Sequence, residues 1–156
     1  MKDKIFIKKG SEEDFNNVLN LIKELAEFEK SPESVTNTVE QMKEEKDYFE
    51  FYVAETDNKI VGFALYFYAY YTWVGKSLYL DDIYIKPEYR GKGIGKILLE
   101  KVILTAKENN CKRVRWQVLD WNENAIKFYK KNGSEISSEW LNCDWDYNFI
   151  KRYKSF

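Results

Sequence analysis

Two hydrophobic periods alternate along the chain, and they predict helices and strands in a mixed order. In residues 15–26, apolar side chains recur at i, i+3, i+4, i+7, i+10 and i+11, which is one face of an α-helix. The preceding Ser11-x-x-Asp14 sequence is typical of a helix start, so we expect a helix that runs to about Glu29. A second clear helical face covers residues 94–106.

Apolar and polar residues alternate in the segments between these helices, which predicts strands. Residues 51–53 and 60–70 flank the turn-prone sequence Thr-Asp-Asn-Lys, and together they predict an antiparallel hairpin. A third strand is expected over 78–85. The other expected elements are a strand over 4–9, a weak helix over 35–46, a strand over 113–119, a helix over 124–132 ended by Gly133, and one or two closing strands over 135–153. This order describes a mixed sheet flanked by helices.

Length and charge limit the possible partners. The 156 residues carry a net charge of about −1, which provides no basic surface for nucleic acid or for a membrane. Residues 1–7 lack the apolar segment of a signal peptide, and no apolar run is long enough to span a bilayer, so we expect a cytoplasmic protein. The two cysteines, Cys111 and Cys143, are too few for a disulfide framework and are not spaced as metal ligands, so no metal site is expected.

The absence of histidine restricts the chemistry further. Without histidine there is no Ser-His-Asp or Cys-His nucleophile, no histidine general base and no histidine metal ligand. Catalysis would have to use carboxylate, tyrosine, lysine, thiol or backbone groups.

The most informative segment covers residues 80–95, where a strand leads into a loop with three glycines and a helix begins at once. N–H groups at a helix N-terminus bind anions, and glycines let a phosphate approach the main chain. A Walker loop is excluded because Arg90 stands where its first glycine is required. A dinucleotide fingerprint is excluded because Lys96 or Leu98 replaces its last glycine. The glycines and the helix N-terminus by themselves predict a pyrophosphate as the natural ligand.

The spacing Arg90-x-x-Gly93-x-Gly95 resembles the coenzyme-A pyrophosphate loop of the GNAT superfamily of N-acetyltransferases. The resemblance to the diamine acetyltransferase branch of this superfamily extends over nearly the whole chain. It rests on Leu80-Asp81-Asp82-Ile83-Tyr84-Ile85, Asp120-Trp121-Asn122-Glu123, Phe128-Tyr129 and Gly133. Two further stretches, Tyr71-Thr72-Trp73-x-Gly75 and Val118-Leu119-Asp120-Trp121-Asn122, are more similar to the thialysine subgroup than to the spermidine/spermine subgroup.

This resemblance implies a fold and an activity. The fold would be the α/β (mixed α+β) GNAT fold, with a central, mostly antiparallel, twisted sheet of six to seven strands and about four helices, in a single domain over residues 1–156. The activity would be transfer of an acetyl group from acetyl-CoA to the primary amine of a small cationic substrate. A homodimer is also implied.

The resemblance further assigns roles to individual residues. Tyr129 would be the general acid, and Asp81 would be the acid that contacts the substrate and holds the water that takes its proton. Acetyl-CoA would be held by Ile83, Tyr84, Ile85, Arg90, Gly91, Lys92, Gly93, Ile94, Gly95, Lys96, Asn122, Glu123, Asn124 and Ala125. The amine would be held by Glu29, Trp73, Asp81, Asp82, Glu139 and Trp140.

Several of these assignments have structural alternatives. Asp81 and Asp82 should point to opposite faces of their strand unless a bulge intervenes, so at most one of them is expected to line a given pocket. The rings of Tyr70, Tyr71, Trp73 and Trp140 could enclose an ammonium through cation–π contacts or could belong to the core. Tyr71 stands where the spermidine/spermine branch has an aspartate, which favours a short amine over a long polycation.

Two other functions remain open. One is a sensor that binds acyl-CoA without turnover. The other is a protein or N-terminal acetyltransferase, which would need an open peptide groove.

Overall fold

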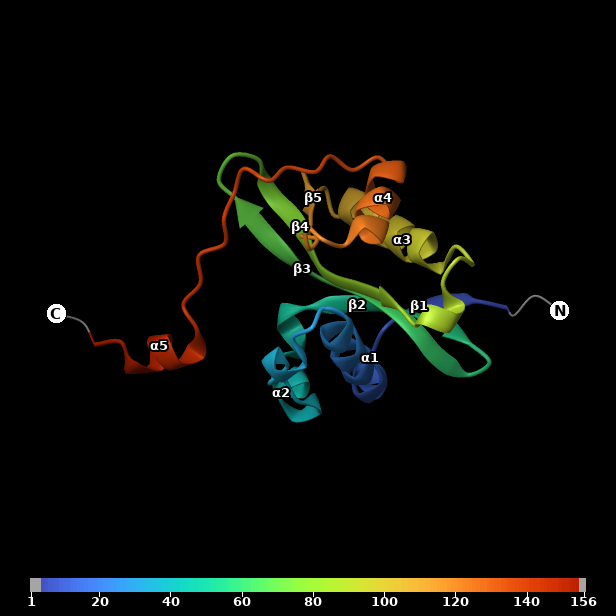
Figure 1. Ribbon diagram of the computed structural model, residues 1–156, viewed down its shortest axis with the longest axis horizontal. Helices are drawn as coiled ribbons and strands as arrows, with labels where there is room; N and C mark the ends of the chain where they lie inside the picture. Colours follow the sequence, from blue (N-terminus) through green and yellow to red (C-terminus); the bar gives the residue numbers. More distant parts are fainter. Residues whose placement is uncertain (1–3, 155–156) are drawn as a thin grey trace. The chain divides into compact units, whose positions relative to one another are not determined.

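The computed structural model describes residues 4–154, and these residues form two compact units divided between Gln117 and Val118. The first unit contains a five-stranded sheet in the order β1-β2-β3-β4-β5 (Figure 1). Its strands are β1 (Phe6–Lys9), β2 (Glu50–Thr56), β3 (Lys59–Tyr71), β4 (Gly75–Ile85) and β5 (Val114–Arg115). Its α-helices are α1 (Phe15–Phe28), α2 (Val39–Glu44) and α3 (Ile94–Glu108). The expectation of a single domain stays a prediction.

Strand direction follows the connections between the strands. The first three pairs of neighbours are antiparallel, and β5 lies parallel to β4 because α3 connects them. The β2–β3 turn has two residues with positive φ, Asp57 at 50° and Asn58 at 59°, as a tight two-residue hairpin requires. The predicted hairpin is therefore confirmed.

Helices cover both faces of this sheet, and the alternating pattern of the strands explains why. Helices α1 and α2 lie on one face and α3 lies on the other (Figure 1). Phe51, Val53 and Phe63 pack with α1 and α2 in one buried cluster. Tyr52, which points to the opposite face, forms a 2.8 Å hydrogen bond with Thr105 on α3.

The second unit contains α4 (Glu123–Lys131) and α5 (Tyr147–Arg152). The side chain of Asn122 caps α4 by accepting a 3.2 Å hydrogen bond from the backbone N–H of Ala125. Gly133 follows the helix with a φ of 89°, as expected for the residue after a helix C-terminus. The predicted helix and its end are therefore confirmed.

The sheet differs from the prediction in size. The part of the chain that the structure describes has five strands instead of six to seven, and five α-helices instead of about four. No strand forms between residues 135 and 153, so the predicted closing strands are wrong. Trp145, Phe149 and Tyr153 recur every four residues and their rings contact in sequence, with centroids 5.4 and 5.8 Å apart. This helical period produces α5, whose N-cap is Asp146.

Two other predicted elements are shorter than expected. The strand predicted over 113–119 pairs only at Val114 and Arg115, and the helix predicted over 35–46 begins after its N-cap Thr38.

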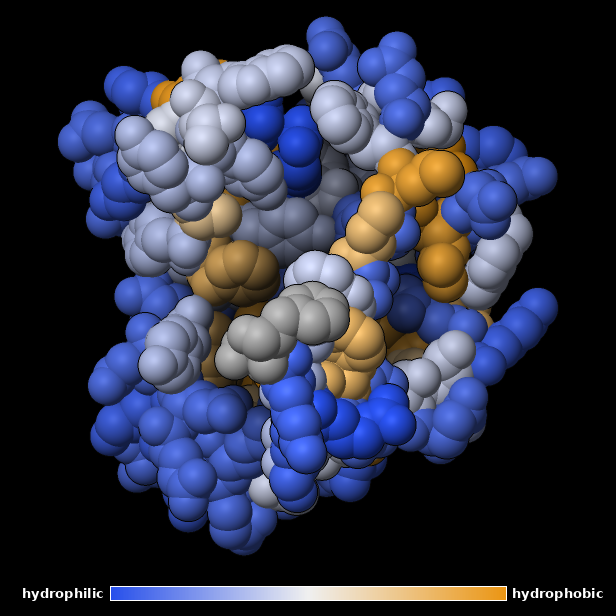
Figure 2. All heavy atoms as spheres, turned by 90° about the vertical axis from the view of Figure 1, so that its left-hand side faces the viewer, coloured by the Kyte–Doolittle hydropathy of each residue, from blue (hydrophilic) through white to orange (hydrophobic). Residues whose placement is uncertain are grey.

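Hydrophilic residues cover most of the face drawn in Figure 2, with smaller apolar areas between them. No helix in residues 4–154 combines the length and the apolar composition needed to cross a membrane.

Candidate functional site

A β-bulge places the two predicted acids of β4. Leu65 on β3 pairs with Asp82, whereas the next residue, Tyr66, pairs with Leu80. Asp81 is therefore the extra residue of the bulge, without a partner in the register. Asp82 shares the α1 face of the sheet with Leu65, which packs against the core cluster on that face. The bulge changes the strict alternation that would otherwise separate the two acids.

A third carboxylate joins this pair from helix α1. Glu29 is the C-cap residue of α1 and is half-buried. Burial raises the pKa of Asp82 to about 7, and the negative charges of Asp81 and Glu29 add to this increase. Burial also raises the pKa of Glu29 and of Asp81, although Asp81 keeps an exposed surface. Asp82 therefore senses the negative charge of both other predicted acids, and Glu29, Asp81 and Asp82 are called the acidic cluster below.

The C-terminal half of β4 has one open edge. On the side of β5, ladder pairing occurs only at Leu78 and Tyr79, so from Leu80 to Ile85 this edge has no ladder partner in residues 4–154. Backbone N–H and C=O groups on such an edge can pair with an extended ligand. This is the segment from which Ile83, Tyr84 and Ile85 were predicted to contact the cofactor.

Arg90 ties the glycine loop to the end of β4. Its Nε atom donates a 2.9 Å hydrogen bond to the carbonyl oxygen of Ile85. Its guanidinium also lies 5.6 Å from the ring centroid of Phe28 and 5.5 Å from that of Tyr84. Tyr84 is held in turn by a 3.2 Å hydrogen bond from its hydroxyl to Glu24. Glu24 and Phe28 were not predicted as site residues, because nothing in the α1 sequence distinguishes them from other helix residues.

The loop that follows Arg90 has the geometry of an anion site. Gly91 and Gly93 adopt φ values of 76° and 82°, and a Cβ atom added at either position would meet no heavy atom within 4 Å. Gly93 is the N-cap of α3, whose first N–H groups have no side-chain cap. Lys96 lies in the first turn of α3, 3.9 Å from Glu100, and Lys92 lies over the ring of Tyr89. The residues present therefore fit a pyrophosphate.

Two aromatic residues near the turn of the β3–β4 hairpin are strongly exposed. Trp73 in the turn is 83% exposed and Tyr70 is 80% exposed, so neither ring belongs to the core. Tyr71 lies beneath two guanidiniums, those of Arg113 and Arg115, at 5.1 and 5.2 Å from its ring centroid. This arginine pair was not predicted, although the alternation of Arg113 and Arg115 places both side chains on one face of a strand.

The remaining predicted site residues belong to the second unit. Asn122, Glu123, Asn124 and Ala125 form the start of α4. Tyr129 is buried on α4, with 7% of its surface exposed. Glu139 and Trp140 are exposed in the irregular segment before α5. Their predicted contribution to the same site as the β4 acids stays a prediction.

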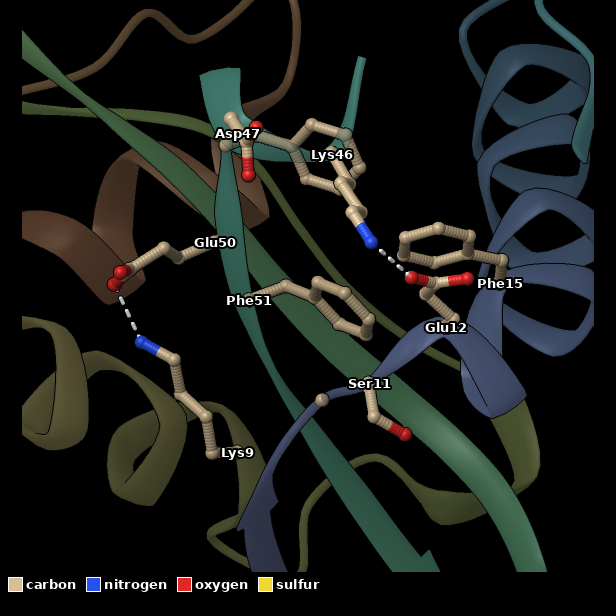
Figure 3. A pocket seen from close by; sticks show the side chains of 10 residues that line it. Lys9, Ser11, Glu12, Phe15, Lys46, Asp47, Glu50 and Phe51 are labelled. Carbon is tan, nitrogen blue, oxygen red and sulfur yellow. Dashed lines mark hydrogen bonds and ion pairs between the residues drawn. The ribbon is translucent and has the colours of Figure 1, made fainter. Parts of the chain in front are cut away.

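A separate pocket of about 200 Å³ lies beside the start of β2 and contains none of the predicted site residues (Figure 3). Phe15, Phe49 and Phe51 contribute its apolar wall. Its two lysines are paired, Lys9 with Glu50 and Lys46 with Glu12. Because its cations are neutralised in this way, we assign it no role in binding an anionic ligand.

Comparison with known proteins gives one consistent result. The model of the acetyltransferase (GNAT) family matches residues 15–133. The chain is 38% identical over 147 residues to a thialysine N-epsilon-acetyltransferase of Bos taurus, covering 86% of both chains. It is 32% identical over 138 residues to a spermidine/spermine N(1)-acetyltransferase-like protein of Homo sapiens, covering 81% of this chain and 20% of that protein.

Solved structures show the same fold. A predicted acetyltransferase from Clostridium acetobutylicum, solved with acetyl-CoA, superimposes with a TM-score of 0.74 at 20% identity, covering 90% of this chain and 96% of that chain. The strand count of the sheet differs from the prediction, but the mixed α/β architecture agrees with it.

Proposed function

Because the chain belongs to the GNAT family of acetyltransferases, we propose that it transfers an acetyl group from acetyl-CoA to the primary amine of a small cationic acceptor. Diamines, polyamines and thialysine-like amino acids are the candidate acceptors, since relatives are named for thialysine and for spermidine and spermine. The observation that carries the proposal is the cluster of Glu29, Asp81 and Asp82, because three neighbouring carboxylates favour a cation.

The glycine loop and the adjacent strand would bind the cofactor. The N–H groups from Gly91 to Lys96 would hold the pyrophosphate, and the open edge of β4 at Ile83–Ile85 would pair with the extended pantetheine arm. Residues 122–125 at the start of α4 are proposed as a further contact. When bound, acetyl-CoA supplies the acetyl group as a thioester.

The acidic cluster would bind the acceptor and take its proton. An amine attacks a thioester only in its neutral form, so the ammonium must first lose a proton. A carboxylate with a pKa near 7, such as Asp82, accepts a proton more readily at neutral pH than an ordinary carboxylate. The proton would pass to a water molecule held by Asp81 and then to the cluster.

Tyr129 is proposed as the general acid for the departing thiolate. A tyrosine hydroxyl with a pKa near 10 is protonated at neutral pH and can therefore donate. Its burial on α4 restricts the motion of the ring. An acyl-cysteine route is disfavoured, because the two free thiols, Cys111 and Cys143, have no histidine to activate them.

Acetyl-CoA turnover with a panel of acceptors tests the proposal. Release of the CoA thiol would be measured with diamines, basic amino acids, a neutral amine and peptides with free N-termini. We expect turnover of the small cations and little turnover of the neutral amine. Binding of acetyl-CoA without any turnover would indicate a sensor, and turnover of peptides alone would indicate a protein acetyltransferase. Either result would overturn the proposal.

We also propose an oligomeric state and a cellular location for the protein. Family resemblance suggests a cytoplasmic homodimer with one domain per chain. Light scattering of the purified protein would give a mass near twice 18.7 kDa for the dimer.

A further inference from the structure

Helix α1 is joined to the end of β4 by one carboxylate. Both oxygens of Glu24 take part: Oε2 accepts a 3.2 Å hydrogen bond from the hydroxyl of Tyr84, and Oε1 lies 2.9 Å from Nζ of Lys86. Tyr84 and Lys86 are two residues apart, so on an extended chain their side chains project to the same side. Glu24 therefore holds two alternate side chains at the point where β4 ends.

The tyrosine that Glu24 holds also contacts Arg90. The ring of Tyr84 is buried, and the guanidinium of Arg90 lies 5.5 Å from its centroid. A phenol that donates to a carboxylate is polarised, which increases the negative charge on its ring and strengthens the attraction for a cation. Burial raises the pKa of the Tyr84 hydroxyl and the negative charge of Glu24 raises it further, so the hydroxyl is protonated and remains a donor at neutral pH. Glu24 thus acts on Arg90 through the ring of Tyr84.

A short turn provides a second connection from Glu24 to Arg90. Lys86 is the residue before the 3₁₀ turn Pro87–Tyr89, and Arg90 is the residue after it. A 3.0 Å backbone hydrogen bond from Tyr89 to the carbonyl oxygen of Lys86 closes this turn. Because Glu24 holds the side chain of Lys86 at the start of the turn, it also restricts where the chain enters the glycine loop.

Helix α1 contacts Arg90 directly one turn further on. Phe28 follows Glu24 by four residues, so the two side chains lie on the same face of the helix. The guanidinium of Arg90 lies 5.6 Å from the ring centroid of Phe28. Arg90 is therefore placed by one ring from α1 and one ring from β4, and Glu24 links these two elements.

We propose that Glu24 is a positioning residue for cofactor binding, because it holds Tyr84 and thereby Arg90 where the glycine loop begins. The ion pair with Lys86 supports the same arrangement. This inference rests on the proposed function, since it concerns the binding of acetyl-CoA at that loop. Glu24 acts through other residues and not on the reacting atoms, so its removal should change the affinity for acetyl-CoA and leave the chemical step unchanged.

Calorimetric titration of Glu24→Gln with acetyl-CoA tests this inference. Glutamine retains the size of the side chain and one acceptor oxygen but removes the charge, which weakens the contacts with Tyr84 and Lys86. We expect the Kd for acetyl-CoA to increase by about three- to tenfold, a modest change because the ion pair is partly exposed. The KM for acetyl-CoA should increase with the Kd, whereas kcat at saturation should change by less than about threefold. Tyr84→Phe removes only the hydroxyl that Glu24 binds and should raise the Kd in the same direction.

Two further variants separate an effect through Arg90 from a general loss of stability. If Glu24 acts through Arg90, adding Glu24→Gln to Arg90→Lys should not raise the Kd further, because lysine no longer stacks on the rings. Glu12→Gln is the matched control for the loss of an ion pair. Glu12 pairs with Lys46 at 2.6 Å beside the pocket that contains none of the predicted site residues, so this variant should leave the Kd unchanged.

The possible outcomes separate this inference from the proposed function. A wild-type protein that does not bind acetyl-CoA would contradict the proposed function itself. Wild-type binding that Glu24→Gln leaves unchanged would contradict the positioning role alone. An equal increase in Kd with and without Arg90→Lys, the same increase in Glu12→Gln, or a loss of kcat without a change in the KM for acetyl-CoA would also overturn this role.

Discussion

The Nε atom of Arg90 donates its hydrogen bond to the carbonyl oxygen of Ile85, which is the last residue of β4. This bond joins the two segments proposed to hold neighbouring parts of the cofactor, the strand edge for the pantetheine arm and the glycine loop for the pyrophosphate. Arg90 thereby fixes where the loop begins, while its guanidinium stays over Phe28 and Tyr84.

Arg90→Lys should therefore weaken acetyl-CoA binding even though it retains the positive charge. Lysine cannot reproduce the Nε–H contact or the planar stacking, and together these are worth about 1–2 kcal/mol, or roughly tenfold in Kd. Calorimetric titration with acetyl-CoA measures this change. Arg152→Lys is the control, since Arg152 makes the same type of bond, 3.0 Å long, to Asn148 in α5. Equal Kd values for Arg90→Lys and wild type would show that the bond does not organise the loop.

Gly93→Val should abolish acetyl-CoA binding. The new side chain would occupy the open space at the N-terminus of α3, and the φ of 82° adds backbone strain of about 1–3 kcal/mol. Gly75→Val is the matched control for strain, because Gly75 has a φ of 90° at the first position of β4. Both variants should melt at lower temperature, but only Gly93→Val should lose binding. Binding retained by a folded Gly93→Val protein would remove the phosphate site from this loop.

The glycine loop and the acids of β4 can be predicted from the sequence, because each depends only on a short run of consecutive residues. Three glycines at alternate positions between a strand and a helix predict an anion site from a few consecutive residues. The sequence does not predict the bulge, because the bulge depends on how β4 pairs with Leu65 and Tyr66. The register of that pairing is set by two strands together and not by one segment. Glu29 was identified by resemblance, and its effect on the proton affinity of Asp82 depends on burial that only the fold creates.

The wrong predictions have a similar origin. Aromatic residues are enriched in strands, and this preference favoured strands over 135–153. The spacing of Trp145, Phe149 and Tyr153 instead matches a helix, and the cap at Asp146 stabilises it. Arg113 and Arg115 could have been paired by their alternation, but their common partner, Tyr71, is more than forty positions away and reaches them only through the sheet.

Acetylation should depend on pH through Asp82. Its raised pKa, about 7, means that the carboxyl is charged above pH 7 and neutral below it. Binding a cation and accepting its proton both require the charged form, so kcat/KM should fall as pH decreases through about 7. Glu29→Gln removes a negative neighbour that raises this pKa, so the acidic limb of the profile should move to lower pH.

The pH profile of kcat/KM with one acceptor, measured from pH 5 to pH 9, checks this shift. Glu27→Gln removes an exposed carboxylate two residues earlier and should leave the acidic limb in place. An acidic limb that is the same in wild type and Glu29→Gln would mean that a group other than Asp82 controls it.

The remaining prediction concerns the leaving group and not binding. The thiolate released from acetyl-CoA resembles that of cysteine, with a pKa near 8.5, so it leaves without a proton donor but more slowly than with one. A positioned general acid contributes about 10²–10⁴-fold to a rate. Tyr129 on α4 is the residue proposed for this role, and its ring is buried while that of Tyr147 on α5 is exposed.

Tyr129→Phe deletes only the hydroxyl and leaves the buried ring in place, so the protein should fold. We expect kcat to fall by about 10²–10⁴-fold, while the free energy of acetyl-CoA binding changes by less than about 1 kcal/mol, the net value of one neutral hydrogen bond. Stopped-flow measurement of the first turnover, together with calorimetry, separates the two effects. Tyr147→Phe removes a hydroxyl from the same unit and should change neither quantity. If Tyr129→Phe keeps more than about a tenth of the wild-type rate in the chemical step, water or another side chain supplies the proton and Tyr129 is a packing residue of α4.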